Sequence, residues 1–127
     1  METTEIFETA DAGLLAGLNE EVQSLHHLLY PEYFKPFKLT EVKAAFGEMF
    51  NGQNAKAFVA IEEGVAVGYI LFFIRKQEEN PFQYAYDFIY IDQVAVSKNS
   101  RKKGIGKALL NKAIETAREN RIDILQL

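Results

Sequence analysis

The segment from Tyr84 to Leu127 constrains the fold most strongly, because a strand-like run there passes through a glycine turn into a helix and then into a second apolar run. The first run, YAYDFIYIDQVAV, is apolar and long enough for a buried strand. After the turn, apolar residues recur with helical spacing at Leu109, Leu110, Ala113, Ile114 and Ala117. The last run, IDILQL, has the length of a short strand. Because a strand, a helix and a strand joined so closely cross over right-handed, the sequence predicts a sheet with a parallel pair of strands.

The residues before this segment predict two helices and an antiparallel meander. The opening TEIFET predicts a short strand, and a helical stripe follows it at Leu14, Leu18, Val22, Leu25 and Leu29. A second helix is predicted between Thr40 and Gly52, and from Ala55 the period changes to that of a strand hairpin, AKAFVAIEEGVAVGYILFFIRK. The predicted order is therefore β-α-α-β-β-β-α-β, an α/β (α+β) fold with a mixed sheet and a single domain over residues 1–127.

Composition excludes several classes of protein and site. The chain of 127 residues has no cysteine, so it can form no disulfide, thiolate zinc site or cysteine nucleophile, and no histidine and carboxylate spacing predicts a metal site. Its longest apolar runs, YILFFI and FIYI, are far shorter than the roughly 18–20 residues of a membrane span. The N-terminus lacks the pattern of a signal peptide, and the net charge of −4 disfavours nucleic-acid binding. We therefore expect a cytoplasmic protein with no metal, no membrane partner and no nucleic-acid partner.

The turn SRKKGIGK has the features of a phosphate site. A helix begins here, and its first four backbone N–H groups lack intrahelical partners and carry partial positive charge. Gly104 and Gly106 allow close approach to these groups, and cations flank them at Arg101, Lys102, Lys103 and Lys107. Two familiar nucleotide motifs are excluded, because Arg101 stands where a P-loop requires glycine and Leu109 stands where the dinucleotide fingerprint requires glycine or alanine. The alternative is a solvated basic turn whose glycines only ease entry into the helix.

The stretch VAVSKNSRKKGIGKALLNKAI resembles the central motif of the GNAT superfamily of N-acetyltransferases. That motif is Gln or Arg, two residues, Gly, one residue, then Gly or Ala, and Arg101, Gly104 and Gly106 fill it. The resemblance implies the acyl-CoA N-acyltransferase fold, with acetyl-CoA as cosubstrate and no metal. It also implies that the pantetheine arm pairs with the strand end at Val94, Ala95 and Val96. The residues implied to bind the pyrophosphate, mainly by backbone N–H groups, are Arg101, Lys102, Lys103, Gly104, Ile105, Gly106 and Lys107.

The resemblance further implies direct transfer of an acetyl group to a primary amine of a small molecule, peptide or protein. Asp92 is the candidate general base, because strand alternation places it on the same face as Val94, near the expected acetyl group. Asp87 is a weaker candidate, since it faces the other way unless a bulge changes the register. His26 and His27 lie on the first predicted helix, where ordinary surface histidines are the alternative to a catalytic role.

The loop between the first two predicted helices is expected to form the acceptor side. Its aromatic residues can wall a pocket, and the candidates are Tyr30, Tyr33 and Phe34. The alternative is a loop that its own aromatic side chains attach to the core.

The family pattern continues, after the strand that corresponds to IDILQL, into a further helix and two more strands that have no counterpart before Leu127. The last strand would then lack a partner on one side, which predicts a homodimer formed through the terminal strand, with each half-site completed by the other chain. A noncatalytic acyl-CoA-binding or regulatory module is the alternative to an enzyme.

Overall fold

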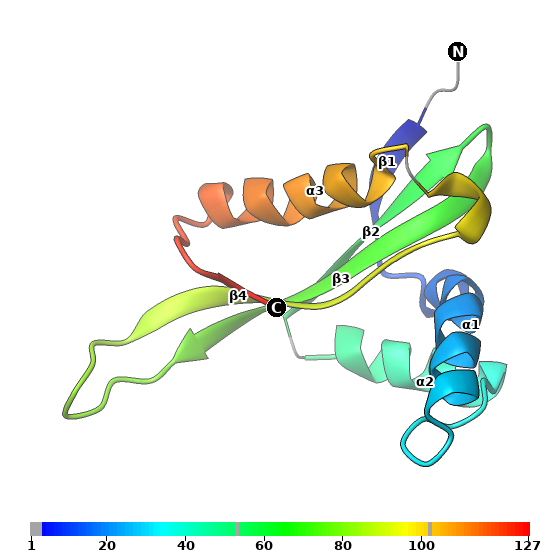
Figure 1. Cartoon of the computed structure of the whole chain (residues 1–127). Helices are drawn as coiled ribbons and strands as arrows, with labels where there is room; N and C mark the ends of the chain where they lie inside the picture. Colours follow the sequence, from blue (N-terminus) through cyan, green and yellow to red (C-terminus); the bar gives the residue numbers. More distant parts are fainter. Residues whose placement is uncertain (1–3, 53, 102) are drawn as a thin grey trace.

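The computed structural model describes residues 4–52, 54–101 and 103–127. Within these ranges the chain forms five strands, three α-helices and one short 3-10 helix (Figure 1). In chain order they are β1 (Thr4–Thr9), α1 (Ala12–Leu29), α2 (Leu39–Phe50), β2 (Ala55–Glu62), β3 (Val65–Gln77), β4 (Tyr86–Val96), η1 (Lys98–Ser100), α3 (Ile105–Glu119) and β5 (Leu125–Gln126). The predicted α/β fold and its order of elements are confirmed.

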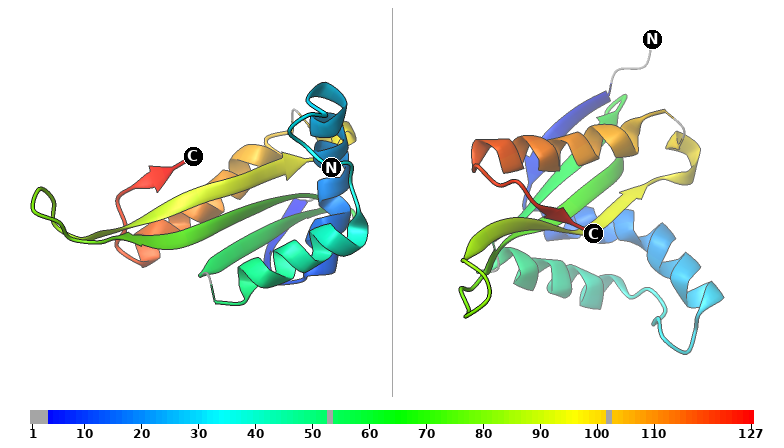
Figure 2. Two further views of the ribbon diagram at one scale, coloured as in Figure 1. Left: turned by 90° about the horizontal axis from the view of Figure 1, so that it is seen from below. Right: turned by 60° about the vertical axis from the view of Figure 1, so that its left-hand side comes forward.

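The strands form one mixed sheet in the order β1-β2-β3-β4-β5. The first four strands are antiparallel neighbours, and β5 is parallel to β4 through the pairs Ile89 with Leu125 and Tyr90 with Gln126. The predicted parallel pair is therefore present. Figure 2 shows that the far end of the β3–β4 hairpin projects well beyond the helices.

Each face of the sheet carries its own apolar core. Helix α3 covers one face, and α1 and α2 cover the other (Figure 1). Strand alternation divides β3 between them, since Ile70 and Phe72 pack in the α3 core and Leu71 packs in the α1/α2 core. Residues of α3 buried against the sheet are Ile105, Leu109, Ala113, Thr116 and Ala117.

Helix α1 is buried through its first half rather than along the predicted stripe. Asp11 caps the helix by accepting a hydrogen bond from the Leu14 N–H, and the buried residues are Leu15, Ala16 and Asn19. Leu25 and Leu29 are 44% and 57% exposed. The predicted stripe is thus wrong at its C-terminal end, because this half of α1 contacts the following loop instead of the sheet.

Gly68 allows β3 and β4 to approach each other near the end of β4. A Cβ atom at this position would lie 2.8 Å from the Ala95 carbonyl oxygen and 3.3 Å from the Val96 Cα atom, both of them backbone atoms. We expect Gly68→Ala to lower the free energy of unfolding by about 1–3 kcal/mol, because the strands must separate. Gly47→Ala is the matched control, since a Cβ atom on that α2 residue meets nothing within 4 Å and the change should raise stability by about 0.5–1 kcal/mol. Urea unfolding of both variants tests the contrast, and equal effects would contradict it.

Candidate active site

Strand β4 contains a β-bulge at Asp92. Leu71 of β3 pairs with Gln93, whereas the next residue, Phe72, pairs with Ile91. Asp92 is therefore the extra residue of β4, with no partner of its own on β3.

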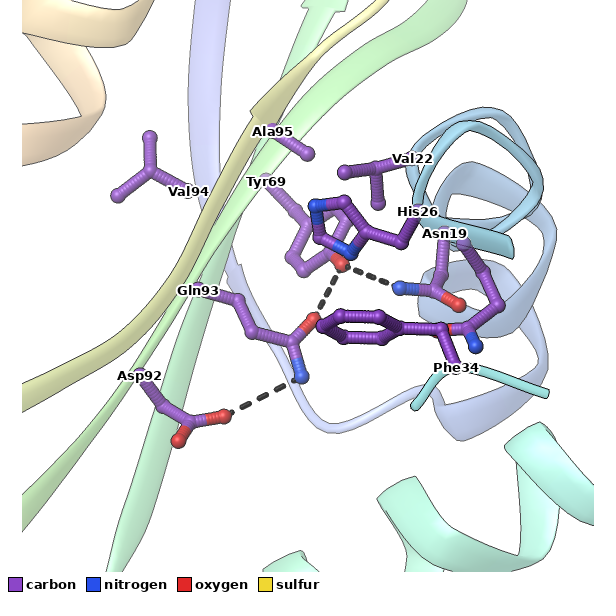
Figure 3. Close-up of a pocket in the computed structure, with 10 residues that line it drawn as sticks. Asn19, Val22, His26, Phe34, Tyr69, Asp92, Gln93, Val94 and Ala95 are labelled. Atoms are coloured by element: carbon purple, nitrogen blue, oxygen red, sulfur yellow. Dashed lines mark hydrogen bonds between the residues drawn. The ribbon is translucent and has the colours of Figure 1, made fainter. Parts of the chain in front are cut away.

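The bulge exchanges the two faces of β4. Tyr90 packs in the α1/α2 core, but Val96, which is also even-numbered, packs in the α3 core. The expectation that Asp92 and Val94 share a face is therefore wrong. Figure 3 shows the side chains of Asp92 and Gln93 on the cavity side of the strand and that of Val94 on the opposite side.

The C-terminal end of β4 presents an open backbone edge. Within the described part of the chain, β5 pairs with β4 only at residues 89–90. On the other side, the Ser97 N–H donates to the Val67 carbonyl oxygen at 2.7 Å. The backbone N–H and C=O groups of successive residues point alternately toward and away from the neighbouring strand, so those of Ser97 and Ala95 face β3. The N–H and C=O groups of Val94 and Val96 therefore point away from β3, toward the open edge.

Arg101 connects the turn after β4 to both β4 and α1. Its Nε donates to the Val96 carbonyl oxygen at 3.0 Å, and its Nη2 lies 3.0 Å from Glu21 Oε2. The same Glu21 carboxylate accepts the Lys98 N–H at 3.1 Å. The side chain of Arg101, one of the cations predicted to flank the phosphate site, is thus directed at Glu21. A cavity of about 160 Å³ beside it is lined by Leu18, Glu21, Val22, Val94, Ala95, Val96, Ser97 and Arg101.

The start of α3 has the predicted set of available N–H donors. Gly104 is the N-cap, with a left-handed φ of 77° and no side-chain capping bond. The Ala108 N–H bonds back to the Gly104 carbonyl oxygen at 3.0 Å, so the N–H groups of residues 105–107 precede the first bond of the helix. Apart from its chain neighbours, no atom of the described residues lies within 4 Å of a Cβ built on Gly104, so its backbone conformation, and not crowding, favours glycine there.

The lysines of this turn differ in their ion pairs. Lys103 Nζ lies 3.4 Å from Glu62 Oε1 at the end of β2, and the Ser100 hydroxyl donates to the same oxygen at 3.3 Å. Lys107 is exposed and forms no ion pair with a described residue. Lys102, also predicted at this site, lies outside the described residues. The turn is therefore held in place by carboxylates from α1 and β2.

A cavity of about 410 Å³ lies between α1 and the bulged end of β4 (Figure 3). It is lined by Asn19, Val22, Gln23, His26, Phe34, Tyr69, Asp92, Gln93, Val94 and Ala95. Of the three aromatic residues predicted to wall an acceptor pocket, only Phe34 lines it. Tyr30 and Tyr33 are 53% and 82% exposed and lie outside it, because the loop turns them toward solvent.

Side chains of α1 hold the Phe34 segment against the cavity. Gln23 Nε2 donates to the Lys35 carbonyl oxygen at 2.8 Å, and His27 Nδ1 donates to the Phe34 carbonyl oxygen at 2.8 Å. The rings of His26 and Phe34 have centroids 4.7 Å apart. His27 is thus a structural residue of the loop, whereas His26 faces the cavity.

A chain of hydrogen bonds connects the α1/α2 core to Asp92 (Figure 3). Asn19 Nδ2 donates to the Tyr69 hydroxyl at 3.2 Å, this hydroxyl donates to Gln93 Oε1, and Gln93 Nε2 donates to Asp92 Oδ2 at 3.2 Å. Burial raises the pKa of Tyr69 from 10.0 to about 12, an effect that the Asn19 hydrogen bond opposes and the Asp92 charge increases. Asn19, Tyr69 and Gln93 were not predicted from the sequence, although a tyrosine inside the apolar run GYILFFI signals a hydroxyl that requires a buried partner.

The raised pKa of Tyr69 predicts a specific loss of stability in alkali. The unfolded chain releases the Tyr69 proton from about pH 10, while the folded chain keeps it to about pH 12. The free energy of unfolding should therefore be unaffected by this group below pH 10 and fall by up to about 1.4 kcal/mol per pH unit between pH 10 and 12. Urea unfolding across this pH range should show that the free energy of unfolding declines less steeply in Tyr69→Phe than in the wild type. Tyr84→Phe, at a side chain that is 87% exposed, should decline like the wild type, and the same slope in all three proteins would contradict the prediction.

Neither a metal site nor a membrane span is found in the described ranges. They contain no group of three or more His, Cys, Asp or Glu side chains that could hold a metal ion. No helix of this part of the chain is both long and apolar enough to cross a membrane.

Known proteins share this fold and part of this sequence. The chain is 36% identical over 88 residues to streptothricin acetyltransferase A of Bacillus subtilis (strain 168), an alignment that covers 69% of this chain and 44% of that protein. The chain thus matches less than half the length of this curated relative. The tetramutant of the BH1408 protein from Bacillus halodurans superimposes with a TM-score of 0.86 at 20% identity, over 97% of this chain and 81% of the other.

A second solved structure has the same fold. A predicted acetyltransferase from Clostridium acetobutylicum, solved with acetyl-CoA, gives a TM-score of 0.70 at 16% identity, over 98% of this chain and 79% of that chain. The model of the acetyltransferase (GNAT) family matches residues 22–127, which include the bulge in β4, the turn before α3 and all residues lining the cavity except Asn19. The chain therefore belongs to the acetyltransferase (GNAT) family.

Proposed function

We propose that this protein is an N-acetyltransferase that transfers an acetyl group from acetyl-CoA to a primary amine of a small molecule, peptide or protein. The main support for the proposal is the bulge at Asp92, which places a carboxylate on the cavity side of β4 immediately before the open backbone edge. An acceptor in the cavity and a thioester along the edge would meet at this point.

The residues of the chain fit acetyl-CoA. The N–H groups of residues 105–107 suit the pyrophosphate, because the start of a helix favours anions. The outward Val94 carbonyl oxygen and the Val96 N–H suit the amides of the pantetheine arm, which would pair as an added strand. Arg101 and Glu21 would act by holding the turn, and Lys107 would add charge at the surface. The Clostridium acetobutylicum structure with acetyl-CoA supports this assignment through a shared fold.

Acetyl-CoA supplies an activated acetyl group as a thioester, and the chain supplies a base and a hydrogen-bond donor. The nitrogen of the acceptor amine forms a bond to the acetyl carbon, the carbon–sulfur bond breaks, and the thiolate leaves. Asp92 receives the proton that the amine loses, directly or through water. The Val94 N–H polarises the thioester carbonyl, as a donor of an oxyanion hole does.

The cavity suits a small cationic amine. Its volume lies in the range of small-molecule sites, and it combines the Asp92 carboxylate, amides of Gln23 and Gln93, and the Phe34 ring. Streptothricin is the first acceptor to test, because the curated relative at 36% identity is named a streptothricin acetyltransferase.

Amine-dependent release of free thiol from acetyl-CoA tests the proposal. The assay uses streptothricin, polyamines, aminoglycosides and peptides with free amino groups, with acetylated product identified by mass spectrometry. Release that requires both protein and amine is the expected result. Saturable binding of acetyl-CoA without release by any amine would contradict the proposal and indicate a noncatalytic acyl-CoA-binding module.

A further inference from the structure

We propose that Tyr69 and Gln93 are positioning residues, in which the Tyr69 hydroxyl orients the Gln93 amide and this amide holds the Asp92 carboxylate toward the cavity. The inference rests on the proposed function, in which Asp92 is the base. It adds two residues that the family motif does not contain.

The chemistry of the donors and acceptors determines which atom donates in each of these hydrogen bonds. A carboxylate only accepts hydrogen bonds, so the Gln93 Nε2 group must face Asp92. Gln93 Oε1 then faces Tyr69, and the tyrosine hydroxyl must donate to it. The remaining lone pair of this hydroxyl accepts the Asn19 amide. Removing the hydroxyl therefore removes the donor that fixes Gln93 Oε1, and the amide is then held only by Asp92 and can move together with the carboxylate.

The bulge allows the adjacent side chains of Asp92 and Gln93 to form a hydrogen bond. In a regular strand, adjacent side chains point to opposite faces and could not bond to each other across one cavity wall. At the bulge, Asp92 and Gln93 share the cavity side (Figure 3). Because Asp92 has no partner on β3, its side-chain direction depends on the hydrogen bond from Gln93.

The core end of this series of hydrogen bonds, at Tyr69 and Asn19, is rigid. Tyr69 is fully buried and meets the Phe46 ring edge to face at 6.0 Å between centroids, and Asn19 is only 7% exposed. Asp92 is exposed. The hydrogen bonds thus connect a fixed core side chain to a carboxylate at the surface of the cavity, which is the arrangement expected of a positioning network.

A double-mutant cycle of Tyr69→Phe and Asp92→Asn tests the inference. Tyr69→Phe should lower kcat by about 10-fold and leave the Kd for acetyl-CoA unchanged, because the hydroxyl lies outside the coenzyme edge. The double variant should be no slower than Asp92→Asn alone, since Tyr69 acts only through Asp92. A kcat within twofold of wild type for Tyr69→Phe, or a double variant slower by the product of the two single effects, would overturn the inference. Tyr84→Phe is the control for removal of a hydroxyl, and it should retain wild-type kcat.

A second measurement does not depend on transfer activity. The side-chain amide signals of Gln93 in ¹⁵N–¹H spectra should move in both Tyr69→Phe and Asp92→Asn and stay in place in Tyr84→Phe. Unmoved signals in Tyr69→Phe would overturn the inference, even for a protein that transfers no acetyl group. If Tyr69→Phe does not fold, Gln93→Ala replaces it in the cycle, with the same loss of kcat and the same lack of additivity with Asp92→Asn expected.

Discussion

Replacing Asp92 with asparagine is expected to lower kcat by about 100-fold or more, the contribution typical of a general base. The change keeps the size of the side chain and its place at the bulge, but it removes the group that accepts the proton of the amine. The Kd for acetyl-CoA should be unchanged, because the coenzyme is assigned to backbone groups of Val94, Val96 and residues 105–107. Steady-state kinetics with a saturating acceptor, together with calorimetry of acetyl-CoA, separate the two effects.

Asp87→Asn is the matched control for this prediction. Asp87 lies on β4 opposite Lys76, before the bulge and on the face that Ile89 and Ile91 present to the α3 core. Its replacement should leave kcat unchanged. A similar loss in both variants, or a kcat for Asp92→Asn within threefold of wild type, would exclude Asp92 as the base.

Replacing Gly104 with valine is expected to weaken acetyl-CoA binding by roughly 10- to 100-fold, which corresponds to losing about one charge-assisted hydrogen bond. The φ of 77° is strongly disfavoured for a β-branched residue, so the turn must change its conformation and move the N–H groups that follow it. Calorimetric titration of acetyl-CoA gives the ratio of Kd values.

Gly52→Val provides the control for backbone strain alone. Gly52 has a φ of 93° and equally free surroundings, but it lies after α2, away from the coenzyme edge. This variant should lose stability to a similar extent and keep its affinity for acetyl-CoA. Equal loss of affinity in both variants would mean that the effect of Gly104→Val is general destabilisation and would contradict the assigned role of the turn.

The elements and the glycine turn could be predicted because they depend on short stretches of sequence. The period of apolar residues changes at Ala55, and Gly104 introduces α3 within a few residues of β4. These features need no knowledge of distant parts of the chain. The order of strands and helices and the family resemblance were therefore accessible from the sequence.

The details of the site depend on residues far apart in the chain. The bulge at Asp92 appears only when β4 is paired with β3, so alternation along β4 alone wrongly placed Val94 on the same face as Asp92. Arg101 lies 80 residues from Glu21, and Tyr69 lies 50 residues from Asn19. Local pattern contains no information about such partners, which is why neither the ion pair of Arg101 with Glu21 nor the network around Tyr69 was predicted.

The most direct test of the coenzyme site is to titrate acetyl-CoA into ¹⁵N-labelled protein and follow the backbone amide signals. We expect saturable shifts concentrated at the amides of Val94, Val96 and residues 105–107, with the Gly52 amide unaffected. Absence of shifts up to about 1 mM acetyl-CoA, an affinity of only about −4 kcal/mol, or shifts confined to other parts of the sheet would contradict the assignment of the open β4 edge and the α3 turn as the coenzyme site.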